Sequence, residues 1–101
     1  MLHMIQKILH KDDGIQPNWL KYALSGDGLL FLDDTVYAAQ TRHPMNVWLQ
    51  QANQAGQTIY ALSLDIQARG LELSTLMPEI RVLSDEQWVD LVVQYACVQT
   101  W

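Results

Sequence analysis

The sequence contains little cysteine and little positive charge, which argues against a disulfide-bonded protein and against a nucleic-acid-binding protein. It contains a single cysteine, Cys97, so no disulfide can form within the chain. Its lysines and arginines number 6 against 11 aspartates and glutamates, which gives a formal net charge of -5. Nucleic acids are bound largely through clustered positive charge on their phosphates. Because the basic residues are scattered along the sequence, direct binding of tRNA or DNA is disfavoured.

Long apolar runs, linkers and repeats are lacking as well. No run approaches the roughly 18 residues that a transmembrane helix needs, and no leader peptide is recognisable, so we expect a cytoplasmic protein without membrane contact. The 101 residues are predicted to form a single domain, residues 1–101. A domain of this size buries a modest share of its surface, so association with other chains would add stability.

Short apolar runs are plentiful, because half of the residues are hydrophobic and four are tryptophans. Four runs predict strands, at residues 2–9, 29–32, 59–62 and 80–83. Residues 29–32 are apolar without alternation, which is typical of a parallel strand covered on both faces. A turn is expected at residues 11–14, and residues 97–101 are expected to form either a short edge strand or a docked tail.

Helical signals lie between the predicted strands. Pro17 suits the first position of a helix in which Leu20, Ala23 and Leu24 share one face, and Gly26 suits the position after its end. This spacing predicts a short amphipathic helix between the first two strands.

Two later helices carry clearer signals. One is predicted from Pro44 to Gly56, and another begins at Ser84, which forms a capping box with Gln87. Their apolar stripes are Met45, Trp48, Leu49 and Ala52 in the first, and Trp88, Leu91, Val92 and Tyr95 in the second. Strands alternating with helices predict an α/β fold. We expect a small flavodoxin-like domain with a mostly parallel sheet of four or five strands and helices on both faces.

Acidic residues follow two of the predicted strands, at the end where open α/β sheets place functional groups. Asp33 and Asp34 form a carboxylate pair of the kind that binds metals or transfers protons, but a role in the loop or as a helix cap is favoured over a partner contact. Asp65 and Arg69 are spaced for an ion pair on a short helix that Gly70 ends. Asp65 is also a candidate cap for that helix.

Signals for a metal or cofactor are weak. His3, His10 and His43 lack the spacing of metal ligands, so no metal site and no cofactor are expected. Residues 26–28 read Gly-Asp-Gly, but Phe31 stands where a dinucleotide fingerprint needs its third glycine, and the motif precedes a strand rather than following one. A tight turn is the favoured interpretation.

Cys97 is the one side chain able to carry persulfide sulfur. A reactive cysteine needs access to solvent and a cation or helix N-terminus that stabilises the thiolate. Cys97 follows the end of the last predicted helix, where the helix dipole disfavours an anion, and the nearest basic residue in sequence is Arg81. These features favour a small apolar filler over a sulfur carrier.

The stretches at residues 26–39 and 59–71, with Met1-Leu2-His3 and the final Val98-Gln99-Thr100-Trp101, resemble the TusB/DsrH family of small subunits from bacterial sulfur-relay complexes. The resemblance covers nearly the whole chain and includes the Asp-x-x-Ala-Arg-Gly pattern of residues 65–70 as a recognition feature. DsrH-type members carry a cysteine in the first helix, where this chain has Trp19, so the chain is TusB-like rather than DsrH-like. Thr35 stands where relatives commonly have glycine, which implies a local change of the loop.

The resemblance implies the same fold and a non-catalytic role. Two copies each of TusB-, TusC- and TusD-like chains would form a heterohexamer, fed by a TusA-like carrier and emptied by a TusE-like one. The sulfur would end as the 2-thio group of the wobble uridine of certain tRNAs. Candidate partner contacts are Asp34 and Trp101, although Trp101 can instead dock on the core of its own chain. Two alternatives remain: a sulfurtransferase or persulfide carrier that uses Cys97, and a homo-oligomeric interaction domain.

Overall fold

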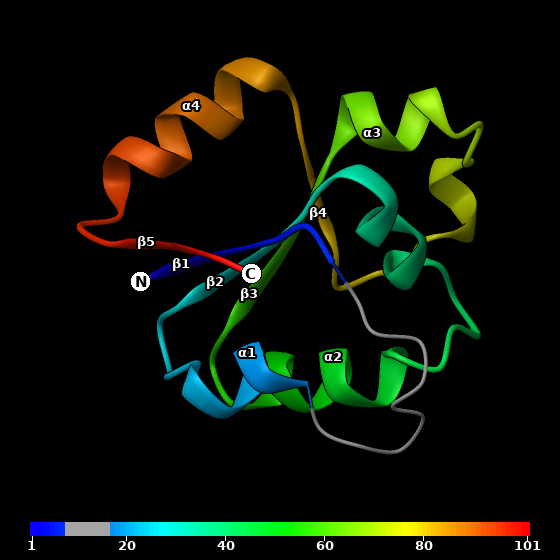
Figure 1. The fold of residues 1–101 in the computed structure, drawn as a ribbon. Helices are drawn as coiled ribbons and strands as arrows, with labels where there is room; N and C mark the ends of the chain where they lie inside the picture. The colour runs from blue at the N-terminus through cyan, green and yellow to red at the C-terminus, as the bar shows by residue number, and fades with distance from the viewer. Residues whose placement is uncertain (8–16) are drawn as a thin grey trace.

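The computed structural model describes residues 1–7 and 17–101, which form a five-stranded parallel sheet flanked by helices (Figure 1). The strands lie in the order β4-β3-β2-β1-β5, and every neighbouring pair is parallel. Their bounds are β1 Leu2–Ile5, β2 Gly28–Phe31, β3 Thr58–Leu62, β4 Arg81–Leu83 and β5 Val98–Thr100. The predicted parallel α/β fold is confirmed, and residues 97–101 supply an edge strand.

Helices cover both faces of the sheet, as predicted (Figure 1). Helices α1 and α2 lie on one face and α4 lies on the other, while α3 packs beside the 3₁₀ helix η1 beyond the carboxyl ends of the strands. The bounds are α1 Asn18–Tyr22, η1 Asp33–Ala39, α2 Asn46–Gln54, α3 Ser63–Ala68, the 3₁₀ helix η2 Leu73–Thr75, and α4 Asp85–Gln94.

Strand β2 lies in the middle of the sheet and its side chains divide between two cores. Leu29 and Phe31 pack with Leu49 of α2, whereas Leu30 packs with Leu91 of α4. All four residues of the strand are buried. The unbroken apolar run therefore reflects coverage by helices on both faces.

The capping box that the sequence predicts at the start of α4 is present. The Gln87 amide donates to Ser84 Oγ at 3.2 Å, and the Ser84 amide donates to Gln87 Oε1 at 2.9 Å. The predicted stripe faces the sheet, since Leu91 is buried and its companions Trp88, Val92 and Tyr95 pack against the same cluster. The opposite side of α4 exposes Val89 and Val93.

The first helix is shorter than predicted. Pro17 precedes it as the N-cap residue, and the helix ends at Tyr22 because Ala23 is already extended. The Leu24 amide donates to the carboxylate of Asp27 instead of to a helical carbonyl, so the chain leaves the helix there. The prediction that Leu24 shares a helical face with Leu20 and Ala23 is therefore wrong, and its side chain is 70% exposed.

Other boundaries move by a few residues. Strand β1 ends at Ile5, and the rest of its predicted span beyond residue 7, like the predicted turn at 11–14, lies outside the described residues. Helix α2 begins at Asn46 rather than at Pro44, because Asn46 anchors its first turn by donating from its side-chain amide to the carbonyls of Ala38 and Gln40. Gly56 follows its end with a φ of 90°, as predicted.

Candidate functional site

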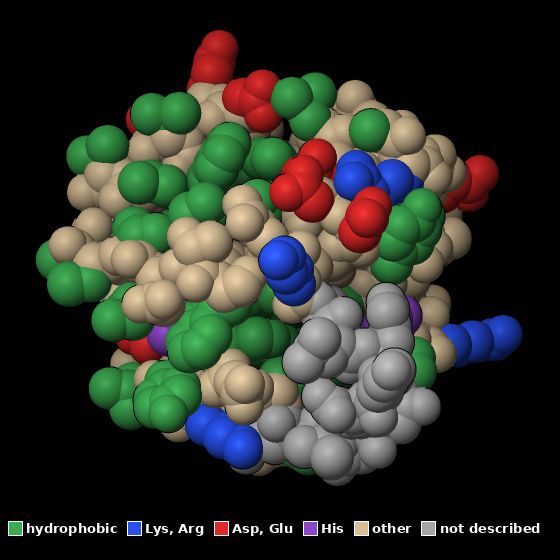
Figure 2. Space-filling view, in the orientation of Figure 1, with side chains coloured by type: hydrophobic (Ala, Val, Ile, Leu, Met, Phe, Trp, Pro, Cys, Tyr) green, Lys and Arg blue, Asp and Glu red, His purple; other side chains and the backbone are tan. Residues whose placement is uncertain are grey.

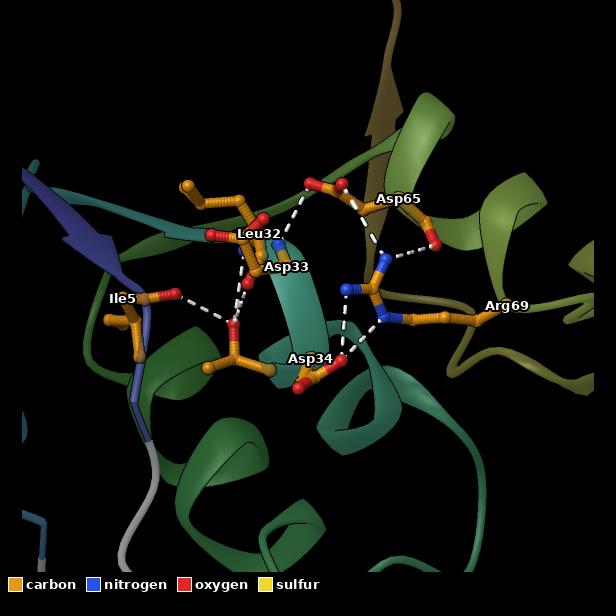
Figure 3. Close-up of polar contacts among 7 residues, drawn as sticks. Ile5, Leu32, Asp33, Asp34, Asp65 and Arg69 are labelled. Atoms are coloured by element: carbon orange, nitrogen blue, oxygen red, sulfur yellow. Dashed lines mark hydrogen bonds and ion pairs between the residues drawn. The ribbon is translucent and has the colours of Figure 1, made fainter.

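The carboxyl ends of β2 and β3 bring four charged residues together, which we call the carboxyl-end cluster: Asp33, Asp34, Asp65 and Arg69 (Figure 3). The two aspartates Asp33 and Asp34 open η1 directly after β2. Asp65 lies in the first turn of α3, directly after β3. Arg69 follows the last residue of α3 and reaches back toward both loops.

Arg69 joins the two loops through its guanidinium group. Its Nε and Nη2 atoms each lie 2.9 Å from Asp34 Oδ1, and its Nη1 atom lies 3.1 Å from the Asp65 carbonyl oxygen and 3.6 Å from Asp65 Oδ1. The hydrogen bond to Asp34, above all, raises the pKa of Arg69 above its ordinary value. The predicted pair with Asp65 is confirmed, but the shorter contact with Asp34 joins residues 35 positions apart, which helical spacing cannot reveal.

Asp65 holds the neighbouring loop and does not cap its own helix. The N-cap residue of α3 is Leu62, so the predicted capping role is wrong. Asp65 Oδ2 instead accepts the backbone amide of Asp33 at 2.8 Å. Asp33 has a φ of 53°, a left-handed conformation that aspartate tolerates better than most residues. The favoured interpretation of Asp33 as a loop residue agrees with this geometry.

Thr35 also holds this loop through hydrogen bonds. Its buried hydroxyl lies 2.6 Å from the Ile5 carbonyl oxygen and 2.7 Å from the Leu32 carbonyl oxygen, and it accepts the Leu32 amide at 3.0 Å (Figure 3). One hydroxyl thus joins the end of β1 to the turn that follows β2. A glycine at this position would have no hydroxyl to make these bonds.

The carboxyl-end cluster orders loops rather than presenting reactive groups. Its aspartates and Arg69 bond to one another or to backbone, and it contains no thiol or imidazole. Within residues 1–7 and 17–101, no three histidine, cysteine, aspartate or glutamate side chains gather as metal ligands. Asp33 and Asp34 are both exposed, and 87% of the Asp34 side chain is accessible to solvent.

A second polar cluster, at the opposite end of the sheet, centres on the buried carboxylate of Asp27. Asp27 Oδ1 accepts the α-ammonium group of Met1, and Oδ2 accepts the Leu24 amide and contacts His3 Nε2, all at 2.9 Å. Burial alone would raise the pKa of Asp27, but these three contacts together hold it below its usual value. Sequence reasoning treated Asp27 only as part of a turn.

His3 is the partner that sequence reasoning missed. It lies in β1 with no exposed surface, and its contact with Asp27 joins residues 24 positions apart. The available signal was a histidine inside an apolar strand, because a buried polar side chain requires a hydrogen-bond partner. The position of that partner emerges only from the parallel pairing of β1 with β2.

Trp101 docks on its own chain. Its indole Nε1 donates to His3 Nδ1 at 3.1 Å, and its ring stacks on Tyr22 with centroids 5.8 Å apart. The ring also packs against the core cluster that contains Ile5. Of the two interpretations that the sequence left open, the structure contains the intramolecular one, and the ring remains partly exposed.

Cys97 is exposed, so its interpretation as a small apolar filler is wrong. It lies between α4 and the edge strand β5, where its carbonyl oxygen accepts the Leu2 amide at 2.9 Å while its side chain faces outward. Exposure meets one requirement of a sulfur carrier. The adjacent helix end is the C-terminus of α4, which disfavours a thiolate, as the sequence predicts.

Together, the fold and the two clusters define a small parallel α/β protein whose charged groups hold its own loops and chain ends. The family described as DsrH like protein matches residues 12–98. Proteins named Protein TusB from Salmonella paratyphi B and Salmonella typhi are each 35% identical to the chain over 99 residues, which is 97% of this chain and 100% of theirs. The chain belongs to the TusB/DsrH family, and this membership supports a role in sulfur relay.

A solved structure shares the fold. The Methanobacterium thermoautotrophicum protein of unknown function MTH1491 superposes with a TM-score of 0.73, covering 99% of this chain and 96% of its own. With 10% sequence identity, that likeness concerns architecture alone. Among the helices of the described residues, none has the length and apolar character needed to cross a membrane.

Proposed function

We propose that this chain is a cytoplasmic, non-catalytic subunit of a TusBCD-type sulfur-relay complex that supports 2-thiolation of the tRNA wobble uridine. The observation that carries the proposal is the 35% identity to Protein TusB over 97% of this chain and 100% of that protein. Residues 1–101 would act as one domain beside TusC- and TusD-like chains in a heterohexamer. A TusA-like carrier would deliver sulfur to the complex and a TusE-like carrier would remove it.

Exposed apolar side chains support a role in assembly. On α4, Val89 is 60% exposed and Val93 is 78% exposed, and Val98 of the edge strand is 41% exposed. Tyr22 and Leu24, at the end of α1, are 68% and 70% exposed. Figure 2 shows hydrophobic side chains gathered on the side of the molecule where α4, β5 and α1 lie. Large apolar surface of this kind is typical of protein interaction sites.

Two side chains are proposed as partner contacts at different ends of the sheet. Asp34 offers an exposed carboxylate at the carboxyl ends of the strands, held in place by Arg69. Trp101 offers the exposed part of a ring that also contacts His3 and Tyr22 of its own chain. A partner that meets Asp34 would need a cation or a hydrogen-bond donor, whereas one that meets Trp101 would need an apolar surface.

Native mass spectrometry tests the assembly. The chain is measured alone and after co-expression with the TusC- and TusD-like proteins of the same source. We expect a mixed complex that contains equal copies of the three chains. A stable homo-oligomer that ignores both partners would contradict the proposal and favour the homo-oligomeric interaction domain. Two variants of α4 then test whether its exposed side lies in the interface. Val93→Asp replaces an exposed apolar side chain and is expected to weaken such a complex. Asp90→Asn changes only a charge on the same helix and is the control, expected to leave the complex intact.

The exposure of Cys97 keeps a second candidate, in which the chain itself accepts sulfur. An accessible thiol is what a persulfide carrier needs. Mass spectrometry of the intact chain after treatment with a persulfide donor would detect a labile gain of one sulfur atom on Cys97. The proposed non-catalytic role predicts that Cys97 gains no more sulfur than the exposed cysteine of an unrelated control protein treated in the same way.

A further inference from the structure

We propose that His3 and Trp101 form a proton-sensitive latch between β1 and β5, closed while His3 is neutral and released when His3 takes up a proton. The latch consists of two hydrogen bonds in series, from the Trp101 indole to His3 Nδ1 and from His3 Nε2 to Asp27. It belongs to this chain alone and does not depend on the proposed partners.

The chemistry of the indole group fixes the state of the imidazole in the closed latch. A tryptophan Nε1–H can only donate a hydrogen bond. His3 Nδ1, 3.1 Å away, must therefore carry no proton and act as the acceptor. The remaining ring proton of neutral His3 is then on Nε2, from which it donates to Asp27 Oδ2 at 2.9 Å. The closed latch requires this one neutral tautomer.

Protonation of Nδ1 removes the acceptor. The imidazolium carries a proton on both nitrogens, so two N–H groups would face each other across the contact with Trp101. His3 has no exposed surface and Trp101 covers Nδ1, so the indole must part from the imidazole before water can deliver the proton. Proton uptake and release of Trp101 are therefore linked, and acid shifts the equilibrium toward the open form.

The charged groups around His3 have opposite effects on its protonation. The carboxylate of Asp27 favours an imidazolium, while the α-ammonium of Met1, bound to the other oxygen of Asp27, opposes it. Tyr22 stacks on the far side of Trp101, and the sheet neighbours of His3 on β2 and β5 are the uncharged Leu29 and Gln99.

One further titratable group lies near Asp27. Burial, more than any other cause, raises the pKa of Tyr95, so its phenol is uncharged throughout the range in which histidines titrate. The attraction of Asp27 for an imidazolium is opposed by the bond from Trp101, by the α-ammonium group of Met1 and by the burial of His3. This balance poises the latch for response to a proton.

The latch holds the last strand of the sheet. The Trp101 amide donates to the Met4 carbonyl at 2.8 Å, and the Gln6 amide donates to the Trp101 carbonyl at 3.0 Å, which continues the pairing of β1 with β5. All three residues of β5 are exposed, and among the strands of residues 1–7 and 17–101 it pairs with β1 alone. Loss of the Trp101 side-chain contacts therefore loosens this end of the edge strand and uncovers the ring of Tyr22.

Nuclear magnetic resonance on the full chain tests the latch. At neutral pH, ¹⁵N shifts of the His3 ring should show a proton on Nε2 and none on Nδ1. Because the closed latch holds only neutral His3, the opening equilibrium should rise as the pH is lowered from about 7.5 to about 5.5. The readout is hydrogen exchange of the Trp101 indole N–H and of the Gln6 amide, corrected for the intrinsic effect of pH on exchange.

Three variants assign the response to the latch. His3→Gln cannot titrate and should remove the acid response, whereas the matched control His43→Gln should keep it. Trp101→Phe lacks the indole donor, so the protection of the Gln6 amide should become low at both pH values. Should His3→Gln not fold, the Trp101→Phe result and the tautomer of the wild-type ring still decide the question.

Several results would overturn the proposal. A proton on Nδ1 at neutral pH would show that the indole bond has the opposite polarity or is not made. Equal protection of Trp101 at both pH values would show that no latch opens. An acid response that survives in His3→Gln would assign it to another group.

Discussion

At the scale of single residues, the hydroxyl of Thr35 joins β1 to the loop after β2. Thr35→Val keeps the shape of the side chain but removes the hydroxyl from two carbonyls and one amide. Because these groups are buried, we expect a loss of about 1–2 kcal/mol in the free energy of unfolding. Urea denaturation measures it. Thr35→Ser keeps the hydroxyl and serves as the control, and equal stability of the two variants would contradict this role.

Asp27 is the residue whose ionisation matters most for stability in acid. Its pKa is lowered in the folded chain, so its contribution is fully present above the unfolded value of about 3.9 and is lost as the pH falls through the lower folded value. Asp27→Asn should lose about 2 kcal/mol at neutral pH, since it removes a charged acceptor from three donors.

The same variant should also lose less stability than the wild type below about pH 4, because it has no carboxylate to protonate. The measurement is the free energy of unfolding against pH. Asp90→Asn, on the exposed side of α4, is the control and should follow the wild-type curve. A Asp27→Asn curve parallel to that of the wild type would contradict the assignment.

Residue roles were predictable where the cause is local and were missed where it is distant. The pairing of Asp65 with Arg69 follows from helical spacing alone. The contact of Asp34 with Arg69 and that of His3 with Asp27 depend on which strands become neighbours, which no local pattern records. The exposure of Cys97 was missed for the same reason, because it depends on β5 being an edge strand.

At the scale of elements, the turn between α1 and β2 is hydrogen-bonded to the turn between α2 and β3. Gly26 and Gly56 both have a φ near +90°, and the Gly26 amide donates to the Gly56 carbonyl at 2.9 Å. A Cβ on Gly26 meets no atom within 4 Å, whereas one on Gly56 would lie 2.5 Å from Ser25 Oγ. An alanine would therefore be strained by the positive φ at both positions, but only at Gly56 would its Cβ also collide with Ser25.

Alanine at the two positions separates these costs. Gly26→Ala should lower the free energy of unfolding by about 1–2 kcal/mol through backbone strain alone, and Gly56→Ala should lower it further. Thermal or urea unfolding of both variants gives the difference. Adding Ser25→Ala to Gly56→Ala should recover the excess, and failure to do so would remove the collision as its cause.

The boundaries of helices that carry a capping motif in the sequence were predicted best. Ser84 and Gln87 mark the start of α4 because their side chains bond the first turn directly. The end of α1 was misplaced because Leu24 fits the helical spacing, yet its amide bonds to the Asp27 carboxylate. A tertiary contact thus overrides a local pattern in a helix of five residues, which has little stability of its own.

At the scale of the whole molecule, sulfur relay by the assembled complex tests the role of Cys97. Cys97→Ser in a complex with TusC- and TusD-like chains should leave tRNA 2-thiolation nearly unchanged, since the proposed subunit carries no sulfur. The measurement is the fraction of 2-thiolated wobble uridine in cells that depend on the variant. Loss of thiolation while the complex still assembles would favour the persulfide-carrier alternative.

The architecture of the sheet was predictable because its central strands are covered on both faces and therefore read as unbroken apolar runs. The strand order was not, since β1 pairs with β2, the next strand along the chain, and also with β5, which follows all the others. Val98–Thr100 is exposed throughout and carries no hydrophobic pattern that would assign it to β1 rather than to β4.

The position of β1 also sets an order of events during synthesis. On the ribosome, Leu2–Ile5 emerges first, but one of its two neighbours, β5, is translated after the other four strands. Until then the nascent sheet ends in an open strand edge made of mostly buried residues, which invites pairing with other chains. A chain that is interrupted before Val98 would therefore leave one edge of β1, a mostly buried strand, without its neighbour.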